Sequence, residues 1–212
     1  MSREVGVLGG AFNPPHIGHL LLAQEAMCAL GLDELILMPT GEAPHKAISP
    51  EPGAKVRLEM ARLAAEGVDG LSVSGSEVER DGPSYAYRTL ELLGNESPGS
   101  QLTFVMGADV AAGLEGWHRP GRVLELSRLA IAQRPGFDRS EVDEALERLG
   151  GRNHAEAIEM PLVGVSSSLV RARIAARRPI RWLVPEAVRR LIAERGLYGA
   201  DASGADGAVG AT

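Results

Sequence analysis

The chain has 212 residues, of which 44% are hydrophobic and 24% are charged, and its formal net charge at pH 7 is −6. This size and composition predict one globular domain with a sizeable core, and the negative charge argues against broad, sequence-independent binding to nucleic acid. No apolar segment reaches the roughly 18 residues that span a bilayer and no signal peptide precedes the first strand, so we expect a cytoplasmic protein without membrane contact.

Short apolar runs alternate with longer helical patterns along the chain. This alternation predicts the α/β class, with a single Rossmann-like domain that has a mostly parallel sheet and helices on both faces. The expected strands are 5–8, 35–38, 71–73, 102–106, 129–132 and 157–160. The expected helices are 18–30, 54–66, 85–93, 110–114, 121–126, 139–149, 168–177 and 185–194.

Residues 1–199 are expected to form the domain. Residues 200–212 contain no large apolar side chain and are expected to be a disordered tail. Cys28 is the only cysteine and lies inside an apolar helical pattern, which predicts a buried hydrophobe and no disulfide. Trp182 is an isolated aromatic residue and is predicted to lie in the core.

The first predicted strand runs into the glycine–histidine turn, residues 9–19, with the sequence GGAFNPPHIGH. Gly9 and Gly10 allow the backbone and a ligand to approach each other closely, and the two prolines stiffen the turn. A helix that begins near residue 15 would place His16 and His19 one turn apart, near the positive end of its dipole. Both rings could then meet one anion.

Three interpretations of this turn remain open. It could be a tight connection with two surface histidines, or a zinc site, although the other candidate ligands are scattered along the chain. The third interpretation is a phosphate site, with helix N–H groups and imidazoles that donate to the anion. Neither G-x-x-x-x-G-K-S/T nor G-x-G-x-x-G occurs, which argues against P-loop and dinucleotide-dehydrogenase folds.

A second candidate anion site is the serine–arginine segment, residues 164–179, with the sequence GVSSSLVRARIAARRP. One or two of its serines can be explained as helix caps. Arg171, however, lies near the start of the predicted helix, where a cation opposes the helix dipole unless an anion is bound. Ser167, Ser168 and Arg171 are therefore predicted phosphate ligands. Lys46 follows the second strand and could add a mobile positive charge.

The two motifs together resemble those of the nucleotidylyltransferase superfamily. GGAFNPPHIGH is similar to G-G-x-F-D/N-P-x-H-x-G-H, and VSSSLVR is similar to I-S-S-T-x-I/L-R. The resemblance is strongest to the bacterial nicotinate mononucleotide adenylyltransferases and extends from residue 5 to residue 199. Phosphopantetheine adenylyltransferases and cytidylyltransferases resemble the chain less closely.

The resemblance implies transfer of AMP from ATP to nicotinate mononucleotide, with Mg²⁺ and with no metal ligand from the protein. Both substrates would be its partners, and a homo-oligomer stays open. The implied catalytic residues are His16, His19, Lys46 and Arg171. The implied ATP-binding residues are Gly9, Gly10, Ala11, Phe12, His16, His19, Gly107, Asp109, Ser167, Ser168 and Arg171. The implied residues for the mononucleotide are Lys46, Ser84, Tyr85, Ala86, Trp117, His118 and Arg134.

The chain departs from the family pattern at several positions. Asn13 stands where aspartate is commoner, and Ala11 and Ser168 stand where threonine is usual. Ala86 and Arg88 stand where threonine and aspartate are frequent, so the resemblance implies backbone contacts to the pyridine ring there. A nucleotide-binding sensor without turnover is a second interpretation, which the release of pyrophosphate from ATP would exclude.

Overall fold

The computed structural model describes residues 2–44, 48–50, 52–133 and 140–200. Within them, six strands form one fully parallel sheet in the order β3-β2-β1-β4-β5-β6. The strands are β1 (Glu4–Gly10), β2 (Glu34–Pro39), β3 (Leu71–Val73), β4 (Gln101–Gly107), β5 (Arg128–Gln133) and β6 (Ala155–Glu159). The α/β, Rossmann-like prediction is confirmed.

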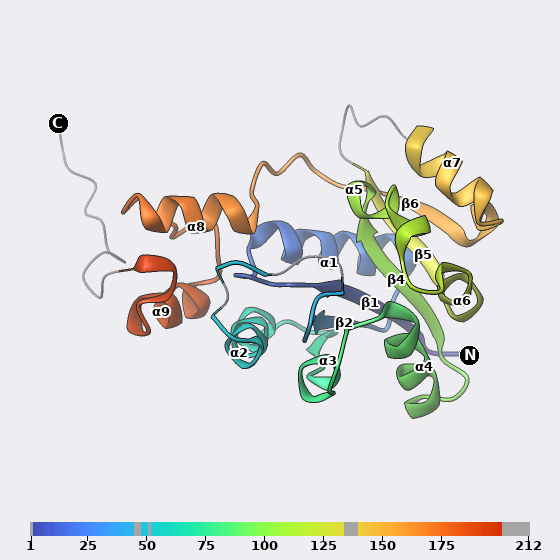
Figure 1. Ribbon diagram of the computed structural model, residues 1–212, viewed down its shortest axis with the longest axis horizontal. Coiled ribbons are helices and arrows are strands. Elements are labelled where there is room, and N and C mark those ends of the chain that lie inside the picture. Colours follow the sequence, from blue (N-terminus) through green and yellow to red (C-terminus); the bar gives the residue numbers. More distant parts are fainter. Residues whose placement is uncertain (1, 45–47, 51, 134–139, 201–212) are drawn as a thin grey trace.

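Helices connect the strands and cover both faces of the sheet, as Figure 1 shows. The α-helices are α1 (Ile17–Leu30), α2 (Ala54–Ala65), α3 (Ser76–Glu79), α4 (Ala86–Glu96), α5 (Ala108–Ala111), α6 (Pro120–Leu126), α7 (Ser140–Arg148), α8 (Ser167–Ala175) and α9 (Glu186–Glu194). The part of the chain that the structure describes also contains three short 3₁₀ helices, η1 (Leu114–Gly116), η2 (Arg152–His154) and η3 (Leu197–Gly199).

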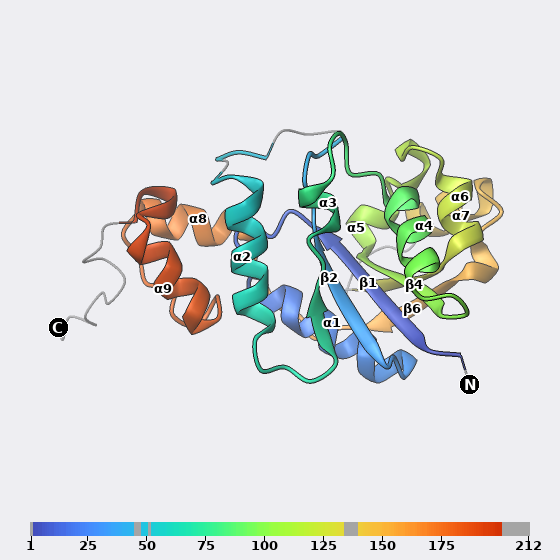
Figure 2. The same ribbon diagram turned by 90° about the horizontal axis from the view of Figure 1, so that it is seen from below.

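The two faces of the sheet bury separate apolar clusters, because successive side chains of a strand point to opposite faces. Val7 and Phe104 pack with Leu90 of α4 on one face, together with residues of α5, α6 and α7. Leu8 and Leu37 lie in the second cluster, on the face covered by α1. A third cluster joins α2, α8 and α9, which lie at one end of the molecule in Figure 2.

The elements agree with the predictions except at short or ambiguous segments. The expected helix 110–114 is replaced by α5 and η1, and α3, a single turn, was not predicted. Gly31 ends α1 with a φ of 59°, as a glycine C-cap does. Residues 201–212 of the predicted tail lie outside the described residues. No described helix is both long and apolar enough to cross a membrane.

Two predictions of burial are wrong. Cys28 is exposed, because α1 is apolar on nearly every side and its pattern does not single out one buried face. The residues of α1 that are buried are Leu22, Ala23 and Ala26. Trp182 is 81% exposed, since it lies in the connection between α8 and α9 and not on a packed helix face.

The order of the strands reverses beside β1, because the chain adds β2 and β3 on one side and then returns to add β4 on the other. In parallel α/β sheets, the carboxyl ends of the strands at such a switch form a crevice that binds ligands. Gly9 and Gly10 end β1, and Gly107 ends β4. The glycine–histidine turn therefore starts at the position where this fold class binds its ligands.

Candidate active site

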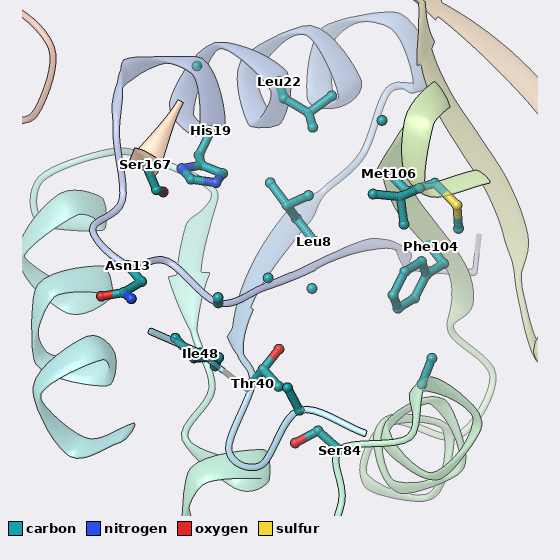
Figure 3. Close-up of a pocket in the computed structure, with 18 of the residues that line it drawn as sticks. Leu8, Asn13, His19, Leu22, Thr40, Ile48, Ser84, Phe104, Met106 and Ser167 are labelled. Carbon is teal, nitrogen blue, oxygen red and sulfur yellow. The ribbon is translucent and has the colours of Figure 1, made fainter. Parts of the chain in front are cut away.

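A cavity of about 740 Å³ opens at the carboxyl ends of β1 and β4, and we call it the central cavity. Figure 3 shows His19 and Ser167 close together on one side of it, with Thr40 and Ser84 on another side and Phe104 and Met106 on a third. Its walls come from segments that are far apart in the sequence, from Leu8 to Arg171. Apolar side chains and a few polar groups line it together, as is usual for a nucleotide-sized site.

The glycine–histidine turn holds its two imidazoles against each other. His16 is the N-cap of α1, which begins at Ile17, and its ring stacks on that of His19 with centroids 3.7 Å apart. The backbone N–H of His16 donates to Nδ1 of His19 at 3.1 Å. Phe12, in the same turn, packs against His19 with ring centroids 4.9 Å apart. The expected convergence of both rings on one place is present.

Gly18 is needed for this packing because it has no side chain. A Cβ atom at residue 18 would lie 3.0 Å from Nδ1 of His16 and 3.6 Å from the carbonyl oxygen of Val165. The first contact is tighter than almost all natural ones. The glycine between the histidines therefore lets the His16 ring lie against the helix start, whereas the distance to Val165 is an ordinary contact that a side chain would tolerate.

The serine–arginine segment docks directly on the glycine–histidine turn. Ser166 caps α8, since its side chain accepts from the N–H of Leu169 at 3.1 Å. The hydroxyl of Ser167 donates to the carbonyl oxygen of Pro14 at 2.8 Å, and Nη1 of Arg171 donates to that of Asn13 at 2.7 Å. Two segments near opposite ends of the chain thus form one wall, with helix N-termini at the same place.

The opposite part of the central cavity is an aromatic wall, formed by Ser84, Tyr85, Ala86, Trp117 and His118. The rings of Tyr85 and His118 stack with centroids 4.4 Å apart. The ring of Trp117 meets Phe104 edge to face at 5.6 Å and an interplanar angle of 82°. A planar aromatic ligand is the kind of group that such rings bind by stacking.

Arg88 lies outside the central cavity, next to the aromatic wall. Its guanidinium carbon is 5.5 Å from the centroid of the Tyr85 ring, and its Nε donates to the hydroxyl of Tyr87 at 3.1 Å. A cation over the face of these rings adds positive charge near the wall. The sequence analysis did not single out this contact, which joins neighbouring residues at the start of α4.

Burial sets the protonation of His19 and Glu77. The pKa of His19 lies well below its ordinary value of 6.5, because surrounding protein displaces water from the ring and because His16 disfavours a second charge. Since Nδ1 of His19 accepts from the backbone, the neutral ring carries its proton on Nε2. Burial also raises the pKa of Glu77, although hydrogen bonds from Thr89 and Ser84 and the charge of Arg80 oppose that rise.

Most of the residues predicted from the sequence line the central cavity. Those that do are Gly9, Gly10, Ala11, His16, His19, Ser84, Tyr85, Ala86, Gly107, Trp117, His118, Ser167 and Arg171. Phe12 is 1% exposed, packs in the core and does not belong to the lining. Asp109 and Ser168 are exposed and do not belong to the lining. Lys46 and Arg134 lie outside the described residues.

The sequence did not single out two buried charged residues at this site. Glu77 lines the central cavity, and Arg57 of α2 is fully buried behind it. Both lie in helical segments where a charged residue is ordinarily exposed to solvent. The only signal was the position of Arg57 in the stretch RLEMARLA, which resembles the family without indicating a role.

Comparisons with known proteins place this chain in a family. A profile described as cytidylyltransferase-like matches residues 7–173. The probable nicotinate-nucleotide adenylyltransferase of Geobacillus thermodenitrificans is 38% identical over 203 residues, covering 96% of this chain and 89% of that protein. The protein of the same name from Dehalococcoides mccartyi is 40% identical, covering 93% of this chain and 98% of that protein.

Solved structures show the same fold at lower sequence identity. The nicotinic acid mononucleotide adenylyltransferase of Plasmodium falciparum complexed with APC has a TM-score of 0.74 and 14% identity, covering 95% of this chain and all of that chain. The same enzyme complexed with NaAD has a TM-score of 0.73 and 15% identity, with the same coverage.

Proposed function

The chain belongs to the cytidylyltransferase-like family and, within it, to the nicotinate-nucleotide adenylyltransferases, and from this premise we propose how its central cavity works. The enzyme transfers AMP from ATP to nicotinate mononucleotide, giving nicotinate adenine dinucleotide and pyrophosphate in NAD biosynthesis. The observation that carries the proposed site is the docking of Ser167 and Arg171 on the glycine–histidine turn, which brings both phosphate motifs to one cavity.

We assign the ATP phosphates to the wall formed by the glycine–histidine turn and α8. The first turns of α1 and α8 have backbone N–H groups without intrahelical acceptors, and these suit an anion. Arg171 uses two of its five N–H donors on Asn13 and Ser168, so others can turn to a phosphate. The hydroxyl of Ser167 would have to leave Pro14 in order to donate to ATP.

His19 acts as a neutral donor in this proposal. Burial lowers the pKa of its ring, and its Nε2–H can stabilise the negative charge that develops on the phosphate oxygens. A nearby phosphate raises the pKa of the ring, so the bound anion opposes the effect of burial. His16 stacks on His19 and holds the ring in place. Gly9, Gly10, Ala11, Phe12, Gly107 and Asp109 are proposed to contact the rest of the nucleotide, Phe12 through its backbone.

We assign the nicotinate ring to the aromatic wall. Trp117 would stack on the ring, and backbone N–H groups near Ala86 and His118 would meet its carboxylate. Ser84 and Tyr85 complete this wall. Lys46 and Arg134 remain proposed phosphate and mononucleotide contacts from the family resemblance alone.

The reaction requires no nucleophilic side chain. An oxygen of the mononucleotide phosphate forms the new bond to the α-phosphorus of ATP, while the bond from that phosphorus to the β-phosphate oxygen breaks and pyrophosphate leaves. The second pKa of a phosphate monoester is near 6, so the attacking group is already mostly dianionic at neutral pH. The protein's task is therefore to align two anions and to lower their repulsion.

Mg²⁺ is proposed to enter with ATP. The described residues contain no group of three or more His, Cys, Asp or Glu side chains that could hold a metal ion. Magnesium binds well to phosphate oxygens and water, and it would neutralise charge on the leaving pyrophosphate. We also propose that the enzyme works in the cytoplasm, where ATP is available.

Pyrophosphate release tests the function directly. The protein is mixed with ATP and Mg²⁺, and then with nicotinate mononucleotide, nicotinamide mononucleotide or no acceptor. We expect rapid release with the acid, slower release with the amide and none without an acceptor. Equal rates with and without an acceptor would contradict the proposal.

A further inference from the structure

Arg57 is a buried arginine whose guanidinium donates hydrogen bonds to backbone carbonyl oxygens. It lies in the first turn of α2 and is 0% exposed. Its Nη1 donates to the carbonyl oxygens of Ala11 at 2.9 Å and Thr40 at 2.6 Å, and its Nη2 donates to that of Gly41 at 3.1 Å. A buried cation needs such partners, because an uncompensated one is costly. One side chain thus holds three backbone carbonyls.

The three carbonyls belong to the two sides of the central cavity. Ala11 is part of the glycine–histidine turn, which carries the proposed ATP ligands. Thr40 and Gly41 begin the loop after β2, and that loop is joined to the aromatic wall: the N–H of Gly41 donates to Oγ of Ser84 at 2.9 Å. The N–H of Ser84 in turn donates to the carbonyl of Glu42 at 2.9 Å. Arg57 therefore links the two sides through a short chain of hydrogen bonds.

The loop after β2 has little freedom to shift on its other side. A Cβ atom at Gly41 would lie 2.1 Å from the carbonyl oxygen of Glu77, so the loop backbone packs directly against α3. The N–H of Thr40 also donates to the carbonyl of Gly10 at 2.9 Å. Arg57 completes this arrangement from the side of α2, where a shorter or unforked side chain would reach fewer of the carbonyls.

We propose that Arg57 is a positioning residue for the reaction: it sets the separation between the ATP-binding turn and the wall that holds the acceptor. This inference rests on the proposed function. Transfer requires the acceptor oxygen to lie in line with the α-phosphorus, and a displacement of about 1 Å can cost about 10²-fold in rate. Because Arg57 is fully buried and does not belong to the lining of the central cavity, its loss alters the alignment of the two sites without removing a ligand from either one.

Two substitutions test the proposal. Arg57→Met removes the donors at similar length, and Arg57→Lys keeps the charge but not the fork. We expect kcat per folded molecule to fall about 10²-fold in Arg57→Met and about 10-fold in Arg57→Lys. The Kd of each substrate, measured by calorimetry with the other absent, should stay within about threefold, since each site keeps its own ligands.

Arg189 offers a matched control. It is another buried arginine, 6% exposed, and it pairs with Glu186 on α9, away from the central cavity. Arg189→Lys should lower the melting temperature while leaving kcat per folded molecule unchanged. The folded fraction of every variant is measured by circular dichroism, so that a smaller amount of folded enzyme is not mistaken for a lower kcat.

The outcomes separate the possible roles. A native kcat per folded molecule in Arg57→Lys would show a merely structural role and overturn the proposal, as would loss of substrate affinity with kcat retained. If Arg57→Met does not fold, Arg57→Lys decides alone. If the wild-type protein itself releases no pyrophosphate, the proposed function fails and this inference fails with it. If the wild-type protein releases pyrophosphate and both Arg57 variants match its kcat, the proposed function stands and this inference alone fails.

Discussion

The wall proposed to receive ATP and the wall proposed to receive the mononucleotide reach their shapes in different ways. On the ATP side, hydrogen bonds between distant segments hold short polar motifs together, as in the 2.7 Å bond from Arg171 to Asn13. On the other side, stacked rings such as Tyr85 and His118 form the surface. Hydrogen-bond donors on rigid helix starts can stabilise the charge that develops in the transition state. Ring stacking, in contrast, stabilises the ground state and the transition state equally.

The largest effect is expected at His19. Replacement by alanine removes one donor to the developing charge, and kcat should fall roughly 10²–10³-fold with little change in fold. Steady-state pyrophosphate release measures this. His154→Ala is the control, because His154 lies just before the amino end of β6, away from the central cavity at the carboxyl ends of the strands, and should keep its full rate. A His19→Ala variant that keeps more than half of the wild-type activity would exclude the assigned role.

A smaller loss is expected at Arg171. Arg171→Ala removes the bond to the Asn13 carbonyl and a charged phosphate donor, and hydrogen bonds of charged groups contribute about 1.5–3 kcal/mol. We therefore expect kcat/KM to fall roughly 10- to 100-fold. Arg173→Ala, on the same helix, removes only a bond to Pro179 and should stay within about twofold. Equal losses in both variants would point to a general effect of helix charge.

Trp117 should behave as a ground-state contact. Trp117→Ala should raise KM for nicotinate mononucleotide by up to roughly 10-fold, because aromatic stacking contributes about 0.5–1.5 kcal/mol. KM for ATP and kcat should change little. Trp182→Ala, at a tryptophan that is 81% exposed, is the control. A fall in kcat without a change in KM would remove the distinction between the two walls.

The smallest effect is expected on stability, at Glu77. Its pKa is raised in the folded protein by burial, so its contribution to stability is fully present below its ordinary pKa of 4.5 and is lost as pH rises through the folded value. Wild type should therefore lose more stability than Glu77→Gln between pH 5 and pH 8. Urea unfolding at both pH values measures this. Glu79→Gln is the control: Glu79 is exposed, so this variant should lose as much unfolding free energy between the two pH values as wild type. An equal loss in Glu77→Gln and wild type would contradict the expectation.

Local sequence patterns predicted the strands and helices better than they predicted the burial and contacts of individual side chains. The six strands were predictable because parallel strands buried on both faces are short, nearly continuous apolar runs. The exposure of Cys28 was not predictable, because α1 is apolar on nearly every side. The exposure of Trp182 was not predictable either, since side-chain type does not indicate what a connecting segment packs against. The single-turn helix α3 is too short to have a periodicity.

The amino-acid sequence by itself determined the chemistry of this protein: the glycines, histidines, serines and arginine that suit phosphate lie in two short contiguous motifs, and their order along the chain requires no knowledge of the fold. Only the tertiary structure decided that Ser167 reaches Pro14 across the molecule, and that Arg57 is buried against Ala11, Thr40 and Gly41. The physical reason is that hydrogen bonds between distant segments depend on how helices and strands pack, and neither local propensity nor periodicity contains that information.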